Sequence, residues 1–559
     1  HVNVPVLSND RPMLERAEEV IDRVMAKVVA LGGVVSGEHG IGITKLKYLE
    51  PERIRELGVH RREVDPGGLM NPGKLEDLDV LDRVFTPSFN LLELEARILQ
   101  HGQLEELAKS IAHCVRCGKC KADCCVYHPA RGMFFHPRNK NLAIGSLIEA
   151  LLYDAQRKRS TRFELLRWLE DVADHCTICH KCLKPCPVDI DTGEVSVLER
   201  RILQSWHYKR QTVATRAALG YLESRSPAYN RLFRSALRVG GAVQRAACEV
   251  AAPFQPADGR PGSYVLQMLR SPMPSMPAET LHDVVPPCEP DQVLVFEPDE
   301  PAEGSGDAVR TVFYFPGCGS ERFQSHISMA ALHVLTSLGV RVIVPPPFLC
   351  CGFPAHVNAK TEQHSRQVLA DTILFSQIRE MFSYLEFDGC VITCGTCREG
   401  LTEMEAAKTF GGRIVDVTAY AAERGLVLHG EASGLLYHAP CHDSLDGKAD
   451  EVLARIGGFG AVEAVPHCCS EAGTLSLSRP DITDAMLHRK REALAENVGD
   501  RRDVTVLTNC PSCVNGLSRS RAQGIEPKHL AVALAERISG ERWLDLFRGR
   551  AAKAHAVHF

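Results

Sequence analysis

Apolar residues near the start of the chain recur at helical spacing. Gly32-Gly33 follows them as a stop signal, so the pattern predicts a helix with this apolar face: Leu14, Ala17, Ile21, Val24, Met25 and Val28. Asp65-Pro66-Gly67-Gly68 marks a later turn. We interpret residues 1–80 as the end of an α/β domain.

Further apolar runs predict helices around two cysteine groups at 90–210. The first run is Leu92, Leu94, Ala96, Ile98 and Leu99, and the second, between the groups, is Leu147, Ile148, Ala150 and Leu151. Residues 211–310 begin with a basic helical segment. From residue 251 to 310 the chain carries eleven prolines, which predict an irregular linker.

Beyond the linker the chain repeats itself. The stretch Val-Ile-Thr-Cys-Gly-Thr-Cys-Arg-Glu-Gly-Leu at 391–401 resembles Val-Leu-Thr-Asn-Cys-Pro-Ser-Cys-Val-Asn-Gly-Leu at 506–517. Self-similarity of this kind indicates a duplicated unit. We therefore predict two related α/β domains, at 311–428 and 434–540.

Composition narrows the class of protein. The chain has 559 residues, 45% hydrophobic and 24% charged, with a net charge of −5. Length predicts roughly three or four domains, and the charge gives no basic field for nucleic acid. We find no apolar run of about 18 residues and no secretory signal, so we expect a cytoplasmic protein without a transmembrane helix.

Twenty-two cysteines are the most informative part of the composition. Two groups read C-x2-C-x2-C-x3-C, the bacterial ferredoxin run, in which the fourth cysteine serves the other cluster. We expect two [4Fe–4S] clusters, one held by Cys114, Cys117, Cys120 and Cys186, the other by Cys176, Cys179, Cys182 and Cys124. Structural zinc is the alternative, and a doubled four-cysteine run fits it poorly. The long helical spacer favours an all-helical dicluster domain.

Each C-terminal repeat carries five cysteines in the order C…CC…C-x2-C. They are Cys318, Cys350, Cys351, Cys394 and Cys397 in the first, and Cys441, Cys468, Cys469, Cys510 and Cys513 in the second. This resembles the cysteine-rich "CCG" domain of the heterodisulfide reductases and of the glycolate oxidase iron–sulfur subunit. The resemblance implies further iron–sulfur clusters. A redox dithiol, such as Cys394 with Cys397, is the alternative. Cys125 is an unassigned extra thiol.

The first 80 residues resemble the C-terminal part of FAD-linked oxidases such as D-lactate and glycolate dehydrogenases. The motifs are His1-Val-Asn3, Gly37-Glu38-His39-Gly40 and Asn71-Pro72-Gly73-Lys74. The resemblance implies a zinc or manganese ion at His1 and Glu38, a substrate contact at Asn3, proton transfer to His39, and a flavin contact at Asn71. We expect FAD to be held mainly by a part of the protein upstream of His1.

Ten basic residues and one acid lie between residues 200 and 245. Leu232, Phe233, Ala236, Leu237 and Val243 can share one helix face, with Arg231, Arg234, Arg238 and Arg245 largely elsewhere. A basic amphipathic helix can lie on an anionic membrane. Packing across the ferredoxin domain is the alternative that we favour.

Together these patterns and resemblances predict a multidomain α+β protein: the end of an FAD-linked oxidase α/β domain, an all-helical dicluster ferredoxin domain and two repeated α/β cysteine-rich domains. The resemblance implies oxidation of a D-2-hydroxy acid, with electrons relayed to a quinone or another carrier, at a peripheral site on the cytoplasmic face of the inner membrane. A heterodisulfide-type thiol reductase and a non-catalytic electron-transfer subunit are the alternatives.

Overall fold

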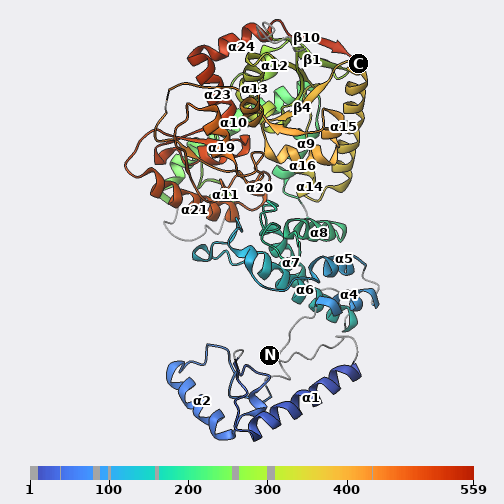
Figure 1. Cartoon of the computed structure of the whole chain (residues 1–559), viewed down its shortest axis with the longest axis vertical. Coiled ribbons are helices and arrows are strands. Elements are labelled where there is room, and N and C mark those ends of the chain that lie inside the picture. The colour runs from blue at the N-terminus through green and yellow to red at the C-terminus, as the bar shows by residue number, and fades with distance from the viewer. Residues whose placement is uncertain are drawn as a thin grey trace. The chain divides into compact units, whose positions relative to one another are not determined.

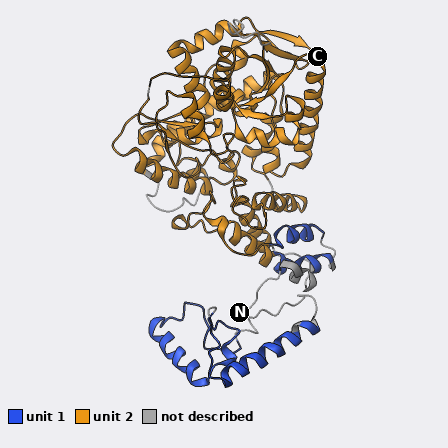
Figure 2. Cartoon of the chain, in the orientation of Figure 1, with its two compact units in different colours: residues 1–113, 148–159 blue, residues 114–147, 160–559 orange. Residues whose placement is uncertain are grey.

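The computed structural model describes residues 11–37, 40–79, 89–98, 102–157, 163–209, 211–254, 264–298, 309–430 and 432–559. The chain divides into two compact units (Figure 2). The smaller comprises His1–His113 with Ile148–Arg159, and the larger comprises Cys114–Leu147 with Ser160–Phe559. Within the described residues, no helix is both long enough and apolar enough to cross a membrane.

Helices dominate the described residues of the smaller unit. They are α1 (Arg11–Ala30), α2 (Pro51–Val64), α4 (Phe89–Ile98) and α5 (Gly102–Ile111). Helix α1 covers the first predicted helix, although Ile21 and Val24 on its expected apolar face are exposed. Asp65 accepts hydrogen bonds from the backbone of Leu69 and Met70, which fixes the predicted turn.

The two ferredoxin-type runs lie in loops among helices. These helices are α6 (Pro137–Arg157), α7 (Phe163–Asp174) and α8 (Thr192–Ser205). Between residues 102 and 209, the described chain forms no strand beyond an isolated bridge of His128 with Met133. The Asp191 side chain caps α8 by accepting from the Gly193 amide at 2.8 Å.

The first cysteine-rich repeat is built on a six-stranded sheet of order β10-β1-β3-β2-β4-β5. Its strands are β1 (Gln292–Phe296), β2 (Thr311–Phe315), β3 (Arg341–Val344), β4 (Phe387–Ile392), β5 (Ile414–Asp416) and β10 (His555–His558). Its helices are α13 (Ser325–Ser337), α14 (Phe353–Val357), α15 (Thr361–Met381), α16 (Gly395–Glu403), α17 (Ala406–Thr409) and α18 (Val417–Glu423). Strand β2 is buried along its whole length, so it lies at the centre of the core.

The second repeat has a four-stranded sheet of order β7-β6-β8-β9. Its strands are β6 (Leu436–Tyr437), β7 (Glu463–Ala464), β8 (Val504–Thr508) and β9 (Ile525–His529). Its helices are α19 (Ala449–Ile456), α20 (Leu475–Ser478), α21 (Pro480–Val498), α22 (Pro511–Ser518), α23 (Leu530–Ser539) and α24 (Trp543–Ala551). All its strand pairs are parallel, as are those among β2 to β5. The order β3-β2-β4-β5 therefore recurs as β7-β6-β8-β9, the same topology twice.

Two strands of the first sheet come from outside the predicted 311–428 domain. Strand β1 lies inside the stretch that its prolines predicted to be irregular, and β10 is the last strand of the chain; the two pair antiparallel (Figure 1). Short helices α11 (Tyr264–Met268) and α12 (Leu281–Val284) also lie in that stretch. The prediction of an irregular linker was wrong at Gln292–Phe296, because the sequence Gln-Val-Leu-Val-Phe between the prolines favours a strand.

The basic segment forms α9 (Val213–Glu223) and α10 (Pro227–Ala251). Helix α10 packs on the first cysteine-rich repeat rather than on the ferredoxin-type loops: Arg234 is buried and donates to the carbonyl oxygens of Arg322 and Pro277. The predicted apolar face is divided, since Phe233 and Leu237 pack inward while Leu232, Ala236 and Val243 are exposed.

Glu199 on α8 is fully buried, and neither of its carboxylate oxygens accepts a hydrogen bond within the described residues. Burial raises the pKa of Glu199 to about 8. The folded protein therefore keeps this proton while the unfolded chain loses it above about pH 4.5, so stability falls as pH rises towards 8.

We expect Glu199→Gln to remove that loss, because the amide cannot ionise. In the variant, the thermal unfolding midpoint of the apoprotein should fall less steeply between about pH 5 and about pH 8. The difference corresponds to at most about 1.4 kcal/mol of unfolding free energy per pH unit. Glu249→Gln, at an exposed position on α10, is the control. Parallel curves for wild type and Glu199→Gln would contradict the assignment.

Candidate metal centres

The first ferredoxin-type run meets the end of the second. Cys114, Cys117, Cys120 and Cys186 line one cavity, together with Cys182. The first three come from a single loop and Cys186 from the other run, which is the arrangement that the crossed ligand assignment requires.

The two runs have the same backbone conformation. Arg116 and Ile178 lie two residues after the first cysteine of each run, and Gly118 and His180 lie two residues further on. All four have positive φ, at 58°, 52°, 77° and 53°. Three of these residues are not glycine, so the surrounding structure must hold them in the left-handed region. Both loops are thus wound so that successive cysteines turn to one side.

Cys124 from the first run lies close to Cys176 and Cys179 of the second. Burial raises the pKa of Cys124 and of Cys182 to about 12. A metal must displace the protons of such thiols, so binding would release protons and strengthen as pH rises. These four-thiol sets have the donor chemistry of a [4Fe–4S] site.

Arg200 on α8 ties the second run to the first repeat. Its guanidinium donates to the carbonyl oxygens of Cys176 at 2.9 Å, Ala173 at 3.0 Å and Val357 at 2.7 Å. On the second repeat, His442 Nε2 donates to the carbonyl of Ile178 at 3.0 Å. The second run is therefore fixed against both cysteine-rich repeats.

In the second repeat the five predicted cysteines form a connected set. Cys441 Sγ lies 3.5 Å from Cys468 Sγ, and Cys469 Sγ lies 3.4 Å from Cys513 Sγ. His438 shares a site with Cys469 and Cys513, where the three ligand atoms are within 4.8 Å of one another.

Lys490 is a buried cation beside these thiols. It contacts His438 Nδ1 at 3.1 Å and donates to the carbonyl oxygens of Val465 at 3.1 Å and Pro466 at 2.9 Å. Burial lowers the pKa of Lys490 to about 8, against the opposing effect of the nearby thiols. A positive charge here would favour thiolates and metal binding.

The first repeat has a matching set and its own cation. Cys318 contacts Cys350, and Cys351 contacts Cys397, which in turn contacts Cys394. Hydrogen bonds from Cys318 and Cys351 lower the pKa of Cys350. The nearby buried cation is Arg322, which donates to Asn230 Oδ1 at 2.9 Å and to the carbonyl of Leu222 at 3.1 Å.

The two repeats meet through their C-x2-C motifs. Cys394 contacts Cys510, and each of these cysteines precedes the helix, α16 or α22, that carries the second cysteine of its motif. The cysteine sulfurs thus form one series. It runs from Cys179 through the second repeat to Cys510, and then from Cys394 through the first repeat to Cys318.

A glycine in each repeat holds the adjacent cysteine pair close to a helix. A Cβ at Gly400 on α16 would lie 2.0 Å from the carbonyl oxygen of Cys351. A Cβ at Gly516 on α22 would lie 2.5 Å from that of Cys469. Both positions belong to the repeated Gly-Leu that ends the self-similar segments, so the close approach is duplicated as well.

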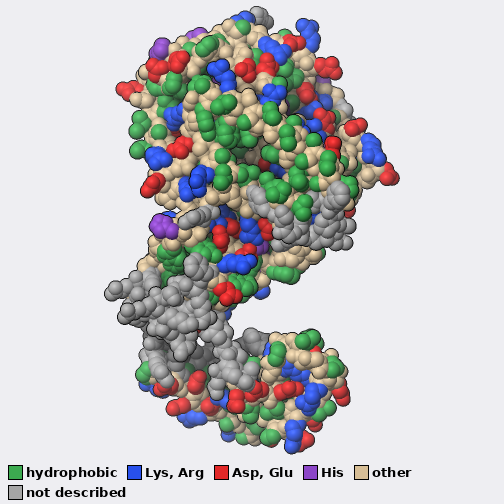
Figure 3. Space-filling view, turned by 180° about the vertical axis from the view of Figure 1, so that it is seen from behind, with side chains coloured by type: hydrophobic (Ala, Val, Ile, Leu, Met, Phe, Trp, Pro, Cys, Tyr) green, Lys and Arg blue, Asp and Glu red, His purple; other side chains and the backbone are tan. Residues whose placement is uncertain are grey.

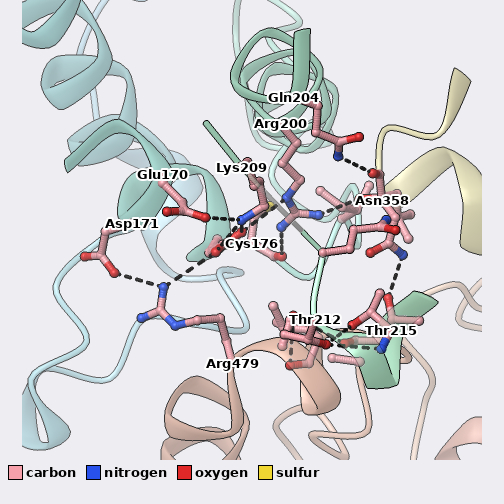
Figure 4. Close-up of a pocket in the computed structure, with 18 of the residues that line it drawn as sticks. Glu170, Asp171, Cys176, Arg200, Gln204, Lys209, Thr212, Thr215, Asn358 and Arg479 are labelled. Carbon is pink, nitrogen blue, oxygen red and sulfur yellow. Dashed lines mark hydrogen bonds and ion pairs between the residues drawn. The ribbon is translucent and has the colours of Figure 1, made fainter. Parts of the chain in front are cut away.

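A cavity of about 670 Å³ lies beside Cys176 (Figure 4). Most of its charged groups pair with one another: Lys209 Nζ lies 3.0 Å from Glu170 and 2.8 Å from Asp174, and Arg479 lies 2.9 Å from Asp171. With these charges neutralised in pairs, the cavity suits an uncharged ligand of small-molecule size.

Four of the flavin-oxidase residues, His1, Asn3, Glu38 and His39, lie outside the described residues. Asn71 is described. It has φ of 48° and its carbonyl accepts from Arg61. Its side chain is exposed on the loop that follows α2. An exposed amide on a fixed loop is compatible with a contact to a flavin. A single exposed side chain cannot by itself bind a flavin.

Sequence reasoning did not find His438, Lys490 or Arg322. The one available signal was position: His438 lies three residues before Cys441, immediately after strand β6. The two cations carried no motif, and only burial beside thiols reveals them.

Comparison with protein families bears out the predicted resemblances. Residues 1–75 match the C-terminal domain of FAD linked oxidases, residues 110–190 match the 4Fe-4S dicluster domain, and residues 312–402 and 435–518 each match the cysteine-rich domain. The chain therefore joins an FAD-linked oxidase C-terminal segment, a 4Fe–4S dicluster domain and a duplicated cysteine-rich domain.

Curated relatives match different parts of the chain. An uncharacterized iron–sulfur protein of Methanococcus maripaludis is 27% identical over 209 residues, 36% of this chain; the match spans only 40% of that relative. The glycolate oxidase iron–sulfur subunit of Escherichia coli is 22% identical, over 72% of this chain and 89% of the relative. Glycolate oxidase subunit GlcD of Bacillus subtilis is 36% identical over 75 residues, 13% of this chain and 16% of the relative. No solved structure matches the chain significantly.

Proposed function

We propose that the chain serves a flavin- and iron–sulfur-dependent oxidoreductase that oxidises a D-2-hydroxy acid of the lactate or glycolate kind. The observation that carries this proposal is the continuous series of neighbouring cysteine sulfurs, most of them buried, from Cys179 to Cys318 in a single compact unit. Iron–sulfur clusters held along such a series would allow stepwise transfer of single electrons across the unit. The matches to the glycolate oxidase iron–sulfur subunit and to glycolate oxidase subunit GlcD support the same function.

Each set of predicted site residues would have its own role in cofactor or substrate binding. The two ferredoxin-type thiol sets would each hold a [4Fe–4S] cluster, and the cysteines of the repeats would hold further clusters. When bound, these groups supply reversible one-electron transfer. At the hydroxy-acid site, His1 and Glu38 would bind zinc or manganese, and Asn3 would contact the substrate. His39 would take the hydroxyl proton and Asn71 would contact FAD.

The cavity beside Cys176 is our proposed site for the electron acceptor. Its internally paired charges favour an uncharged molecule such as a quinone over a charged carrier. Apolar side chains of Trp168, Ile178 and Leu475 line it, which suits a planar ring.

Helix α10 offers a surface for peripheral contact with the cytoplasmic face of the inner membrane. Its outward face carries an apolar stripe at helical spacing: Leu232, Ala236, Val239, Val243, Ala246 and Val250. Arg231 and Arg238 are exposed on the same helix. On the opposite face of the molecule from Figure 1, the larger unit shows mixed hydrophobic, basic and acidic side chains (Figure 3).

We expect Val239→Glu with Val243→Glu to lower co-sedimentation with phosphatidylglycerol vesicles several-fold, because both side chains are exposed on the stripe. Leu369→Glu is a matched control, since Leu369 is equally exposed but lies on α15. Equal vesicle binding by wild type and the double variant would contradict the membrane proposal.

A heterodisulfide-type thiol reductase is the second candidate, and burial disfavours it. Cys394, Cys397, Cys510 and Cys513 are only 7%, 3%, 3% and 4% exposed, which leaves little access for a disulfide substrate. A non-catalytic electron-transfer subunit shares the relay and differs only in lacking chemistry at residues 1–80.

The experiment for the proposed function mixes the anaerobically reconstituted chain with a flavin subunit of the GlcD kind, glycolate or D-lactate, and a water-soluble quinone analogue. Quinone reduction should be several-fold faster with the reconstituted chain than with the apo chain. No difference between the two would contradict the relay. Reduction of a disulfide substrate in place of the quinone would support the thiol reductase.

A further inference from the structure

Cys125, the thiol that the ferredoxin pattern leaves unassigned, lies within the second cysteine-rich repeat's site. Its Sγ is 3.6 Å from Cys441 Sγ, and the Sγ atoms of Cys125, Cys441 and Cys468 all lie within 4.8 Å of one another. Cys125 and Cys441 are more than 300 positions apart in the chain. The proximity is therefore a product of the tertiary fold.

The loop that follows Cys125 is anchored on α21 of the second repeat. His128 Nδ1 donates to the carbonyl of Ala485 at 3.3 Å, and Arg489 donates to the carbonyl of Tyr127 at 2.9 Å. Val126 is buried in the same apolar cluster as Cys468. Hydrogen bonds and core packing of the residues directly after Cys125 thus determine where Cys125 lies.

Cys125 also connects two sites. It contacts Cys179 of the second ferredoxin-type run, and Cys179 in turn contacts Cys441. In the first repeat, the counterpart of Cys441 is Cys318, and it contacts Cys350 of its own repeat. The two repeats therefore differ at this corner, where the second receives a sulfur from the dicluster domain.

We propose that Cys125 is a sixth thiolate ligand of the iron–sulfur centre in the second cysteine-rich repeat, which makes that centre a composite of two domains. The inference rests on the proposed occupancy of the repeats by clusters. On ligation the Cys125 thiol would release its proton to solvent, and its sulfur would replace a water ligand on a cluster iron with no change of oxidation state. The second centre would then be the one that adjoins the dicluster domain.

The first test needs no variant. Wild-type chain, apo and anaerobically reconstituted, is treated with iodoacetamide, and each cysteine is quantified by mass spectrometry. We expect Cys125 to become protected on reconstitution in parallel with Cys441 and Cys468. Cys288, which lies outside the repeats' cysteine sets, should label equally in both states. Equal labelling of Cys125 in both states would overturn the proposal.

The second test uses iron and sulfide content and the electron paramagnetic resonance spectrum. Cys125→Ala should lower iron content and alter the spectrum, and the loss should not add to that of Cys441→Ala, because both residues would serve one centre. Cys248→Ala, at a thiol buried on α10, is the matched control and should leave both readouts unchanged.

Three results of this second test would count against the proposal. Wild-type iron and spectrum in Cys125→Ala would overturn it. A loss that fails to add to that of Cys124→Ala would assign Cys125 to the dicluster domain and also overturn it. If Cys441→Ala itself leaves iron unchanged, the proposed cluster in the second repeat fails, and the inference about Cys125 fails with it.

Discussion

Cys186→Ala is expected to empty the cluster site of the other cysteine run, at Cys114, Cys117 and Cys120, and to leave its own run loaded. The reason is the shared cavity, in which Cys186 faces three cysteines of the first loop. The single variant should lose about four irons per chain. The measurement is iron and acid-labile sulfide per chain after anaerobic reconstitution.

Double variants make this prediction sharp. Cys114→Ala with Cys186→Ala should lose the same iron as either single variant, because both remove one cluster. Cys176→Ala with Cys186→Ala should lose about twice as much, about eight irons, because it removes two. The reverse outcome would contradict the crossed assignment. In that case the iron losses would add in Cys114→Ala with Cys186→Ala, and Cys176→Ala with Cys186→Ala would lose no more iron than either single variant.

Gly400→Ala is expected to disrupt the first repeat. The new methyl group would lie 2.0 Å from the Cys351 carbonyl oxygen, a distance no real contact allows. Either α16 or the Cys350-Cys351 loop must move. We expect a destabilisation of about 3 kcal/mol, despite the better helix propensity of alanine. The checks are the thermal midpoint and the iron content.

The matched control is Gly220→Ala on α9, where a Cβ meets nothing within 4 Å. It should be neutral or slightly stabilising. Gly516→Ala should repeat the Gly400→Ala effect on the second repeat, because its methyl group would lie 2.5 Å from the Cys469 carbonyl. If Gly400→Ala were as stable and as rich in iron as Gly220→Ala, the cysteine pair would not be positioned by this contact.

The duplicated architecture could be predicted from the sequence because it leaves a local signal. The paired C-x2-C segments follow strands β4 and β8, and the repeated strand order follows from that duplication. The ferredoxin-type runs could also be predicted from the sequence, since the ligands of such clusters are cysteines at fixed spacing.

Features that depend on distant contacts could not be predicted. Strand β10 completes the first sheet from the far end of the chain. Arg234 was predicted to lie largely off the apolar face of its helix, yet it is buried, because the carbonyl oxygens of Arg322 and Pro277 accept hydrogen bonds from its guanidinium. The position of Cys125 depends on contacts with α21, about 360 residues away in sequence, which no local pattern encodes.

The most direct measurement for the whole account is iron, acid-labile sulfide and zinc per chain in anaerobically prepared protein, with electron paramagnetic resonance after reduction. The account predicts at least about eight irons with matching sulfide and the signals of reduced [4Fe–4S] clusters. Zinc without sulfide, and no signal on reduction, would contradict it.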